Sequence, residues 1–277
     1  SEELRTSQIN QTITFSEDSP LIDFVTDINW TEHDKLLKVA FPTTIRSKFA
    51  RFGIQFGHIT RPTHINTLRD FAKFETCGRW ADLSDSTTGV ALMSNVKSGF
   101  DVHENVIRMS LLKSSTVPDK WADFGIRKFS YRAVFHTSSF EESKVVFYSD
   151  ELVCPISVST TNNETVPSFN ITKKLPQEAS FVKLDSDKII METLKLSYDN
   201  ENGFVVRVYE STGGWVKSKI SFPLLAAKQW KVEVVDLLER PVSDDQNVKK
   251  IEGNEFLELE IELKPFELLS IMLIKLD

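Results

Sequence analysis

Cysteine, long apolar runs and signal-like segments are scarce or missing in this sequence of 277 residues. Its two cysteines, Cys77 and Cys154, lie far apart and outside any metal-ligand spacing. Neither a disulfide framework nor a cysteine zinc site is therefore expected, and we predict two reduced, buried thiols. No apolar run reaches the roughly 18 residues of a membrane-spanning helix, and segment 1–10 is too polar for a secretion signal. Because the sequence starts without Met, we expect a processed or excised piece of a longer protein.

Basic residues are also in deficit. The chain has 33 Lys and Arg against 40 Asp and Glu, which gives a formal net charge of -7. Nucleic acids and anionic membranes normally bind to a basic face, so this balance argues against both as partners. An uncharged or cationic ligand is easier to accommodate.

Short segments with alternating apolar residues make up most of the chain. They are rich in Val, Ile, Phe and Thr and are separated by Asn, Asp, Gly, Ser and Pro, which is typical of strands joined by turns. The clearest segments are 11–15, 36–41, 90–94, 107–112, 130–135, 204–209, 230–235 and 256–263. None carries the apolar stripe of an amphipathic helix, and the almost wholly apolar segment 270–276 fits a strand buried on both faces. We therefore predict an all-β fold with little helix.

The composition changes between residues 153 and 175. Three prolines flank a polar run in this part of the chain, namely Pro155, Pro167 and Pro176. Such a stretch is typical of a domain boundary. We predict a β unit over residues 1–152, a linker over 153–179 and a terminal β-sandwich domain over 180–277.

The densest polar stretch is segment 57–70, which contains two His, two Arg, one Asn and one Asp. We predict a loop here, because Pro62 cannot donate a hydrogen bond to a sheet and the apolar alternation lapses. Long polar loops on β scaffolds often carry function. A structural alternative is that these residues only hold the loop in place, with Asp70 pairing Arg61 or Arg69.

A metal site is one chemistry that this stretch suggests. His58 and His64 could be two ligands, and either Asp70 or His103 could be the third. The spacing does not demand a metal, since a zinc site needs a full ligand set and supporting hydrogen bonds.

Two further kinds of site are suggested by residue type alone. Glu75 and Asp82 could be the acid and base of a glycosidase, which needs two suitably spaced carboxyl groups. Three tryptophans could stack on sugar rings, although buried core aromatics are more common; they are Trp80, Trp121 and Trp215. The sequence has no glycine-rich phosphate loop, nucleophile elbow or zinc-binding helix motif.

Several phrases, in this order, resemble one family. They are DINWTEHDKLLKVAFP (27–42), QFGHITRPTH (55–64), NT (66–67), KFE (73–75), RWADLS (79–84), GVAL (89–92), VRVYESTGG (206–214) and LKPFE (263–267). Together they are similar to the C-terminal region of family-38 glycoside hydrolases, the class II α-mannosidases, in their cytosolic and vacuolar subgroup. The resemblance spans nearly the whole chain.

The resemblance implies a fold and a division of labour. The chain would be part of a large, galactose-mutarotase-like β-supersandwich followed by a smaller β-sandwich. It would lack the opening strands of that sheet, so its free edge would bind the N-terminal catalytic part of the same enzyme. That part would hold the catalytic carboxylates and a divalent metal, typically zinc and in some relatives cobalt. The chain itself would supply no catalytic residue and no metal ligand.

The implied function is that of a retaining α-mannosidase that removes terminal α-linked mannose from oligosaccharides. The chain would scaffold the enzyme and help to shape its active site through the polar segment, where we expect substrate contacts from Arg61, His64, Asn66 and Asp70. A homo-oligomer is expected, in the cytoplasm or in the vacuolar or lysosomal lumen. Two alternatives remain open: a stand-alone carbohydrate-binding or adhesion β-sandwich without catalytic activity, and a purely structural assembly surface.

Overall fold

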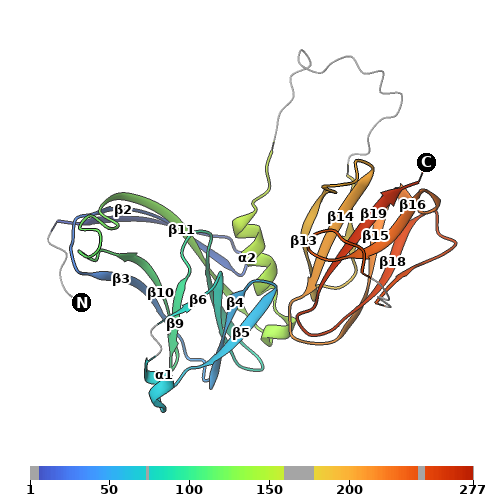
Figure 1. Ribbon diagram of the computed structural model, residues 1–277. Coiled ribbons are helices and arrows are strands. Elements are labelled where there is room, and N and C mark those ends of the chain that lie inside the picture. Colours follow the sequence, from blue (N-terminus) through green and yellow to red (C-terminus); the bar gives the residue numbers. More distant parts are fainter. Residues whose placement is uncertain (1–5, 73–74, 159–177, 243–246, 277) are drawn as a thin grey trace. The chain divides into compact units, whose positions relative to one another are not determined.

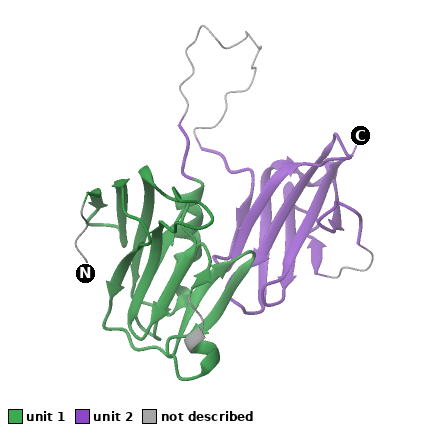
Figure 2. Cartoon of the chain, turned by 60° about the vertical axis from the view of Figure 1, so that its left-hand side comes forward, with its two compact units in different colours: residues 1–154 green, residues 155–277 purple. Residues whose placement is uncertain are grey.

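The structure is a computed structural model that describes residues 6–72, 75–158, 178–242 and 247–276. The chain forms two compact units, Ser1–Cys154 and Pro155–Asp277, which Figure 2 shows in different colours. Most of the predicted linker 153–179 lies outside the described residues, since 159–177 are not described. Each unit is described below by itself.

Unit 1 is built from two antiparallel sheets (Figure 1). The larger has seven strands in the order β1-β2-β11-β8-β7-β4-β5. Their bounds are β1 (Gln8–Phe15), β2 (Leu21–Trp30), β11 (Gly125–His136), β8 (Gly89–Ser94), β7 (Trp80–Ser84), β4 (Phe49–Ile54) and β5 (Gly57–Pro62). The smaller sheet consists of β3 (Leu36–Pro42), β10 (Val106–Lys113), β9 (Gly99–His103) and β6 (Thr76–Cys77).

The two sheets of unit 1 pack face to face around one apolar core. Phe52 and Tyr131 from the larger sheet share this core with Phe100 and Met109 from the smaller one, and each is at most 2% exposed. Side chains alternate between the faces of a strand, so each strand places every second residue in the core. This is why the alternation in the sequence locates the strands.

A helix covers the outer face of the larger sheet. α2 (Val145–Val153) and the 3₁₀ helix η1 (Phe140–Glu142) place Val145 and Phe140 against Trp80 and Met93 in a second core cluster. Strands β7 and β8 are consequently buried on both faces. The only other α-helix among the described residues is α1 (Leu68–Ala72), so helix is indeed scarce.

Unit 2 is a sandwich of two four-stranded antiparallel sheets. The first consists of β12 (Lys183–Leu184), β15 (Val216–Ala226), β18 (Phe256–Leu263) and β17 (Val248–Lys250), in that order. The second consists of β13 (Ile189–Leu196), β14 (Gly203–Glu210), β19 (Leu268–Lys275) and β16 (Trp230–Val235). Phe222 and Leu259 from the first sheet meet Val208 and Ile271 from the second in a common core.

The predicted all-β fold is confirmed. Each of the eight segments picked out by alternation lies within a strand: 11–15 in β1, 36–41 in β3, 90–94 in β8, 107–112 in β10, 130–135 in β11, 204–209 in β14, 230–235 in β16 and 256–263 in β18. The apolar end of the chain forms β19, with five consecutive buried residues from Leu269 to Leu273.

The prediction of buried thiols is wrong, because Cys77 and Cys154 are both exposed and free. Cys77 belongs to β6, a two-residue strand at the edge of its sheet, where one face remains open. Cys154 follows the last residue of α2 and has no core to enter.

The outermost strand of the larger sheet is unusually open. All eight residues of β1 are exposed, and they include Ile9 at 42%, Ile13 at 53% and Phe15 at 75%. Among the described residues β1 pairs only with β2, so the backbone groups on its other side have no strand partner. Edges of this kind readily pair with further chain.

Candidate functional site

The polar segment 57–70 is a strand, a short loop and a helix, so the prediction of one long loop is wrong at both ends. β5 runs from Gly57 to Pro62 and pairs antiparallel with β4, where Pro62 lies opposite Phe49. β5 is the last strand of its sheet, and a proline is tolerated there because its missing N–H would have faced no neighbour. Segment 57–62 can therefore be a strand because it lies at the edge of the sheet, which the alternation of apolar residues does not reveal.

The helix α1 begins with a reciprocal side-chain cap. The Thr67 hydroxyl donates to Asp70 Oδ2 at 2.7 Å, and the Asp70 backbone N–H donates back to Thr67 Oγ1 at 3.1 Å. A cap of this kind fixes the entry into a helix that is otherwise too short to be stable. His64 Nδ1 lies 3.7 Å from Asp70 Oδ2 and accepts the Asn66 N–H at 3.4 Å. Asp70 is therefore held by Thr67 and lies near His64, and it forms no ion pair with Arg61 or Arg69 among the described residues.

Residues of the capped helix and of strand β5 line an open pocket of about 530 Å³. Its lining includes Arg61, Arg69 and Asp70 from these two elements, together with Glu75 and Cys77. Among the described residues neither arginine forms an ion pair, so both guanidinium groups keep donors for a ligand. Of the four residues that the sequence proposed for substrate contacts, Arg61 and Asp70 line this pocket.

The other two predicted residues, His64 and Asn66, do not line the pocket. His64 reaches it only through its contact with Asp70, and Asn66 is an exposed loop residue. Three further lining residues were not proposed for substrate contacts: Arg69, considered only as a partner of Asp70, Glu75, considered only as an acid–base candidate, and Cys77. Arg69 lay inside the polar segment, but the contribution of Glu75 and Cys77 depends on strand pairing that the sequence does not display.

Glu75 belongs to a half-buried ionic network over the smaller sheet. Its Oε1 accepts a hydrogen bond from Lys38 Nζ at 2.7 Å and another from the Ser110 hydroxyl. Lys38 Nζ also contacts Asp101 Oδ2 at 2.5 Å, and Arg108 Nε donates to Asp101 Oδ1 at 2.6 Å. Two carboxylates and two cations thus compensate one another, which lets the network stay partly buried.

Asp82 is held in a different network, so it forms no acid–base pair with Glu75. Fully buried on β7, it accepts hydrogen bonds from His136 Nε2 at 2.9 Å and from the Ser84 hydroxyl at 2.6 Å. Burial lowers the pKa of His136, but the hydrogen bond to Asp82 and its negative charge outweigh this and raise the pKa above its usual value. Both groups are occupied in holding β7 to β11.

The suggested metal ligands do not come together. His58 packs its ring against Phe140, with 4.9 Å between ring centroids, while His64 lies beside Asp70. No group of three or more His, Cys, Asp or Glu side chains among the described residues is arranged to hold a metal ion. In the same part of the chain, no helix is long and apolar enough to cross a membrane.

The three tryptophans have different environments. Trp80 is 4% exposed and packs in the second core cluster of unit 1, as the structural alternative expects. Trp121 is 58% exposed and contacts the rings of His33 and Phe124. Trp215, in unit 2, is 66% exposed. Two of the three are thus accessible to a ligand.

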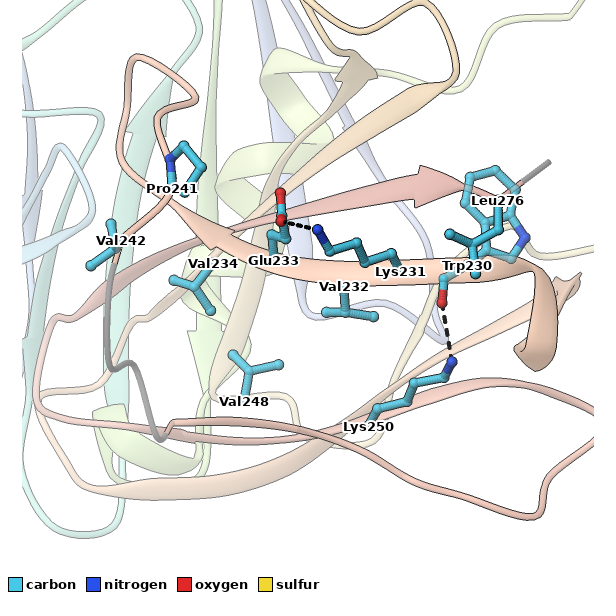
Figure 3. A pocket seen from close by; sticks show the side chains of 10 residues that line it. All are labelled: Trp230, Lys231, Val232, Glu233, Val234, Pro241, Val242, Val248, Lys250 and Leu276. Atoms are coloured by element: carbon cyan, nitrogen blue, oxygen red, sulfur yellow. Dashed lines mark hydrogen bonds and ion pairs between the residues drawn. The ribbon is translucent and has the colours of Figure 1, made fainter.

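Unit 2 has a pocket of its own, of about 620 Å³, between the edge strands β16 and β17 (Figure 3). Most of its lining is aliphatic. Lys250 Nζ donates to the Trp230 carbonyl at 3.0 Å, and Lys231 pairs with Glu233 at 2.6 Å. These contacts satisfy one another, so the pocket offers less polar recognition than the one in unit 1.

Two family models match the chain. Residues 2–121 match the one described as "Glycosyl hydrolases family 38 C-terminal domain", and residues 188–271 match "Glycosyl hydrolases family 38 C-terminal beta sandwich domain". The chain belongs to glycoside hydrolase family 38. The resemblance to the C-terminal region of this family, which was identified from the sequence, is therefore confirmed.

Relatives of this family-38 region are similar over most of the chain. Alpha-mannosidase G of Dictyostelium discoideum is 39% identical over 207 residues, 74% of this chain and 18% of its own length. Alpha-mannosidase 2C1 of Homo sapiens is 32% identical over 273 residues, and the alpha-mannosidase of Saccharomyces cerevisiae is 32% identical over 268; these matches cover 97% and 91% of this chain and 24% of each relative. The chain thus spans about a quarter or less of the curated relatives it matches.

A solved structure has the same fold. The crystal structure of an alpha-mannosidase from Enterococcus faecalis V583 superposes with a TM-score of 0.76 at 19% sequence identity. The match covers 100% of this chain and 30% of the other. At this identity, the similarity speaks for the fold alone.

Proposed function

We propose that the chain is the C-terminal β portion of a retaining α-mannosidase, which hydrolyses terminal α-linked mannose in oligosaccharides. The observation that carries this proposal is the match of both units to family-38 models, together with relatives named as alpha-mannosidases. The chain scaffolds the enzyme, and its pocket beside Arg61 and Asp70 forms part of the cleft wall. The complete protein acts in the cytoplasm or in a vacuolar or lysosomal lumen.

The chemistry of bond cleavage belongs to the rest of the enzyme. Because the described residues offer no group of three metal ligands, the zinc or cobalt that the resemblance implies does not fit this segment. We place the metal and the catalytic carboxylates in the N-terminal part of the enzyme. The residues of this chain bind and orient the sugar.

That N-terminal part is also the proposed partner of β1. All residues of this strand are exposed, three of them large and apolar, and its outer backbone groups have no strand partner among the described residues. In the complete enzyme, the outward N–H groups of β1 are expected to resist hydrogen exchange as strongly as those bonded to β2. Rapid exchange of the outward groups would mean that the edge stays open.

The substrate role of the pocket is tested in the complete enzyme. Replacing Arg61 or Asp70 by Ala should lower kcat/KM for a mannose oligosaccharide roughly tenfold, because each removes a hydrogen-bonding group from the sugar. Arg46→Ala is the matched control, since this arginine is exposed and does not line the pocket. Unchanged kinetics in the variants at 61 and 70 would remove the role, and no turnover of any α-mannoside would remove the proposed function.

One observation favours a second candidate, a glycan-binding β-sandwich without catalysis. Trp121 and Trp215 are exposed, and exposed tryptophans stack well on sugar faces. Binding of mannosides by the isolated chain, lost on Trp121→Ala or Trp215→Ala, would support it. The homo-oligomer expected from the resemblance would be tested by sizing the complete protein before and after truncation at Ser180.

A further inference from the structure

The pocket beside Arg61 shares part of its lining with a second pocket. This second pocket has a volume of about 440 Å³, and both pockets are lined by Glu75 and Cys77. The second pocket is also lined by Lys113 and Asp123. We call the two pockets together the Glu75 trough.

Strand register builds the shared wall of the trough. Cys77 of β6 lies opposite Gly99 of β9, and β9 is followed in the sheet by β10, which carries Ser110. A Cβ added at Gly99 would overlap Glu75 Oε2. The absence of a side chain at position 99 therefore lets the Glu75 carboxylate lie across β9 and accept the hydrogen bond from Ser110.

The charges along the trough are nearly balanced. Its lining contains four basic residues, Arg61, Arg69, Lys97 and Lys113, and three acidic ones, Asp70, Glu75 and Asp123. A phosphate-rich or nucleic-acid ligand needs an excess of positive charge, which is missing here. A sugar hydroxyl both donates and accepts hydrogen bonds, so a lining with both cations and carboxylates suits it.

The size of the two pockets also fits a chain of sugars. Each pocket lies within the roughly 300–1,000 Å³ range of small-molecule sites, and their linings include residues of α1 and of the loop that carries Asp123. Hydrogen bonds rather than stacking would provide recognition, since no aromatic side chain lines either pocket among the described residues.

We propose that the Glu75 trough binds the sugar units of an uncharged oligosaccharide that lie away from the linkage being cut. The inference rests on the proposed function, since it assumes a mannoside substrate. Contacts to remote sugars help to position the reacting one, so they raise kcat/KM for long substrates more than for short ones. Glu75 is then a residue that determines preference for chain length.

The two cysteines allow a matched test in the complete enzyme, because both are exposed and only Cys77 lines the trough. Cys77→Phe should narrow the trough and lower the ratio of kcat/KM for a mannose oligosaccharide to that for an aryl α-mannoside roughly tenfold, equivalent to about 1.4 kcal/mol. Cys154→Phe should leave this ratio unchanged. Gly99→Ala should lower it as well, by displacing Glu75 without changing any charge.

A binding readout separates this inference from the proposed function. A mannose oligosaccharide should slow the alkylation of Cys77 by N-ethylmaleimide, measured by peptide mass spectrometry. Free mannose should not protect Cys77, and the oligosaccharide should not protect Cys154. Two results would overturn sugar binding in the trough. One is a Cys77 that is unreactive in the complete enzyme, and the other is an equal effect of Cys77→Phe on kcat/KM for both substrates. If no mannoside is turned over, the proposed function fails. Protection of Cys77 by an oligosaccharide then still shows whether the trough binds sugars.

Discussion

Glu239 provides the sharpest prediction for stability, because its carboxylate holds two loops of unit 2 together. It pairs with Lys195 Nζ, accepts the Tyr198 N–H at 2.8 Å and accepts the Ser197 hydroxyl at 2.9 Å. Burial raises the pKa of Glu239, but these three contacts outweigh it and lower the pKa from 4.5 to about 2. The ionised form is therefore strongly preferred in the folded state.

The size of the effect follows from this shift. A difference of about 2.5 pKa units corresponds to at most ~3.4 kcal/mol at neutral pH. Lys195 is 38% exposed, so water screens the ion pair and we expect about 2 kcal/mol. Because the folded pKa is depressed, this stabilisation is complete above pH 4.5 and is lost as the pH falls through about 2.

Urea unfolding of unit 2, followed through hydrogen exchange in β14 and β19, measures this contribution. Glu239→Gln should lower the free energy of unfolding by about 2 kcal/mol at pH 7 and by much less near pH 2. Glu201→Gln is the control, since Glu201 is an exposed residue of the neighbouring turn. A Glu239→Gln effect of the same size at both pH values would refute the reasoning, because it would not depend on ionisation.

Three further predictions concern other polar anchors. Glu210→Gln should lower the stability of unit 2 by about 2 kcal/mol in urea unfolding, because the buried carboxylate accepts the N–H groups of Thr212, Gly213 and Phe266; an unchanged midpoint would contradict this. The pKa of His136 is raised, so its contribution to the free energy of unfolding of unit 1 should be complete below pH 6.5 and lost as the pH rises through the raised pKa. This loss of stability should be absent in His136→Gln. Thr67→Val should lower the stability of the capped helix α1 by about 1 kcal/mol and speed its hydrogen exchange, whereas Thr67→Ser should keep the cap.

Local patterns were enough to predict much of the fold. Alternation of apolar residues revealed strands such as β10 and β18, because the period of two is imposed by each strand on its own residues. The apolar segment that forms β19 was recognised by its lack of alternation, since a strand buried on both faces needs no polar positions. Family phrases spread along the chain led to the same region that both family models match.

Within the candidate site, the sequence by itself determined which groups are available, and the tertiary structure decided which of them meet. Arg61 and Asp70 lie close in sequence and were both proposed, and both line the pocket. Asp82 and His136 are 54 residues apart, and only the pairing of β7, β8 and β11 brings them together. The exposed position of Cys77 and the Glu75 trough likewise depend on strand neighbours, since hydrogen-bonded register joins residues without regard to their separation along the chain.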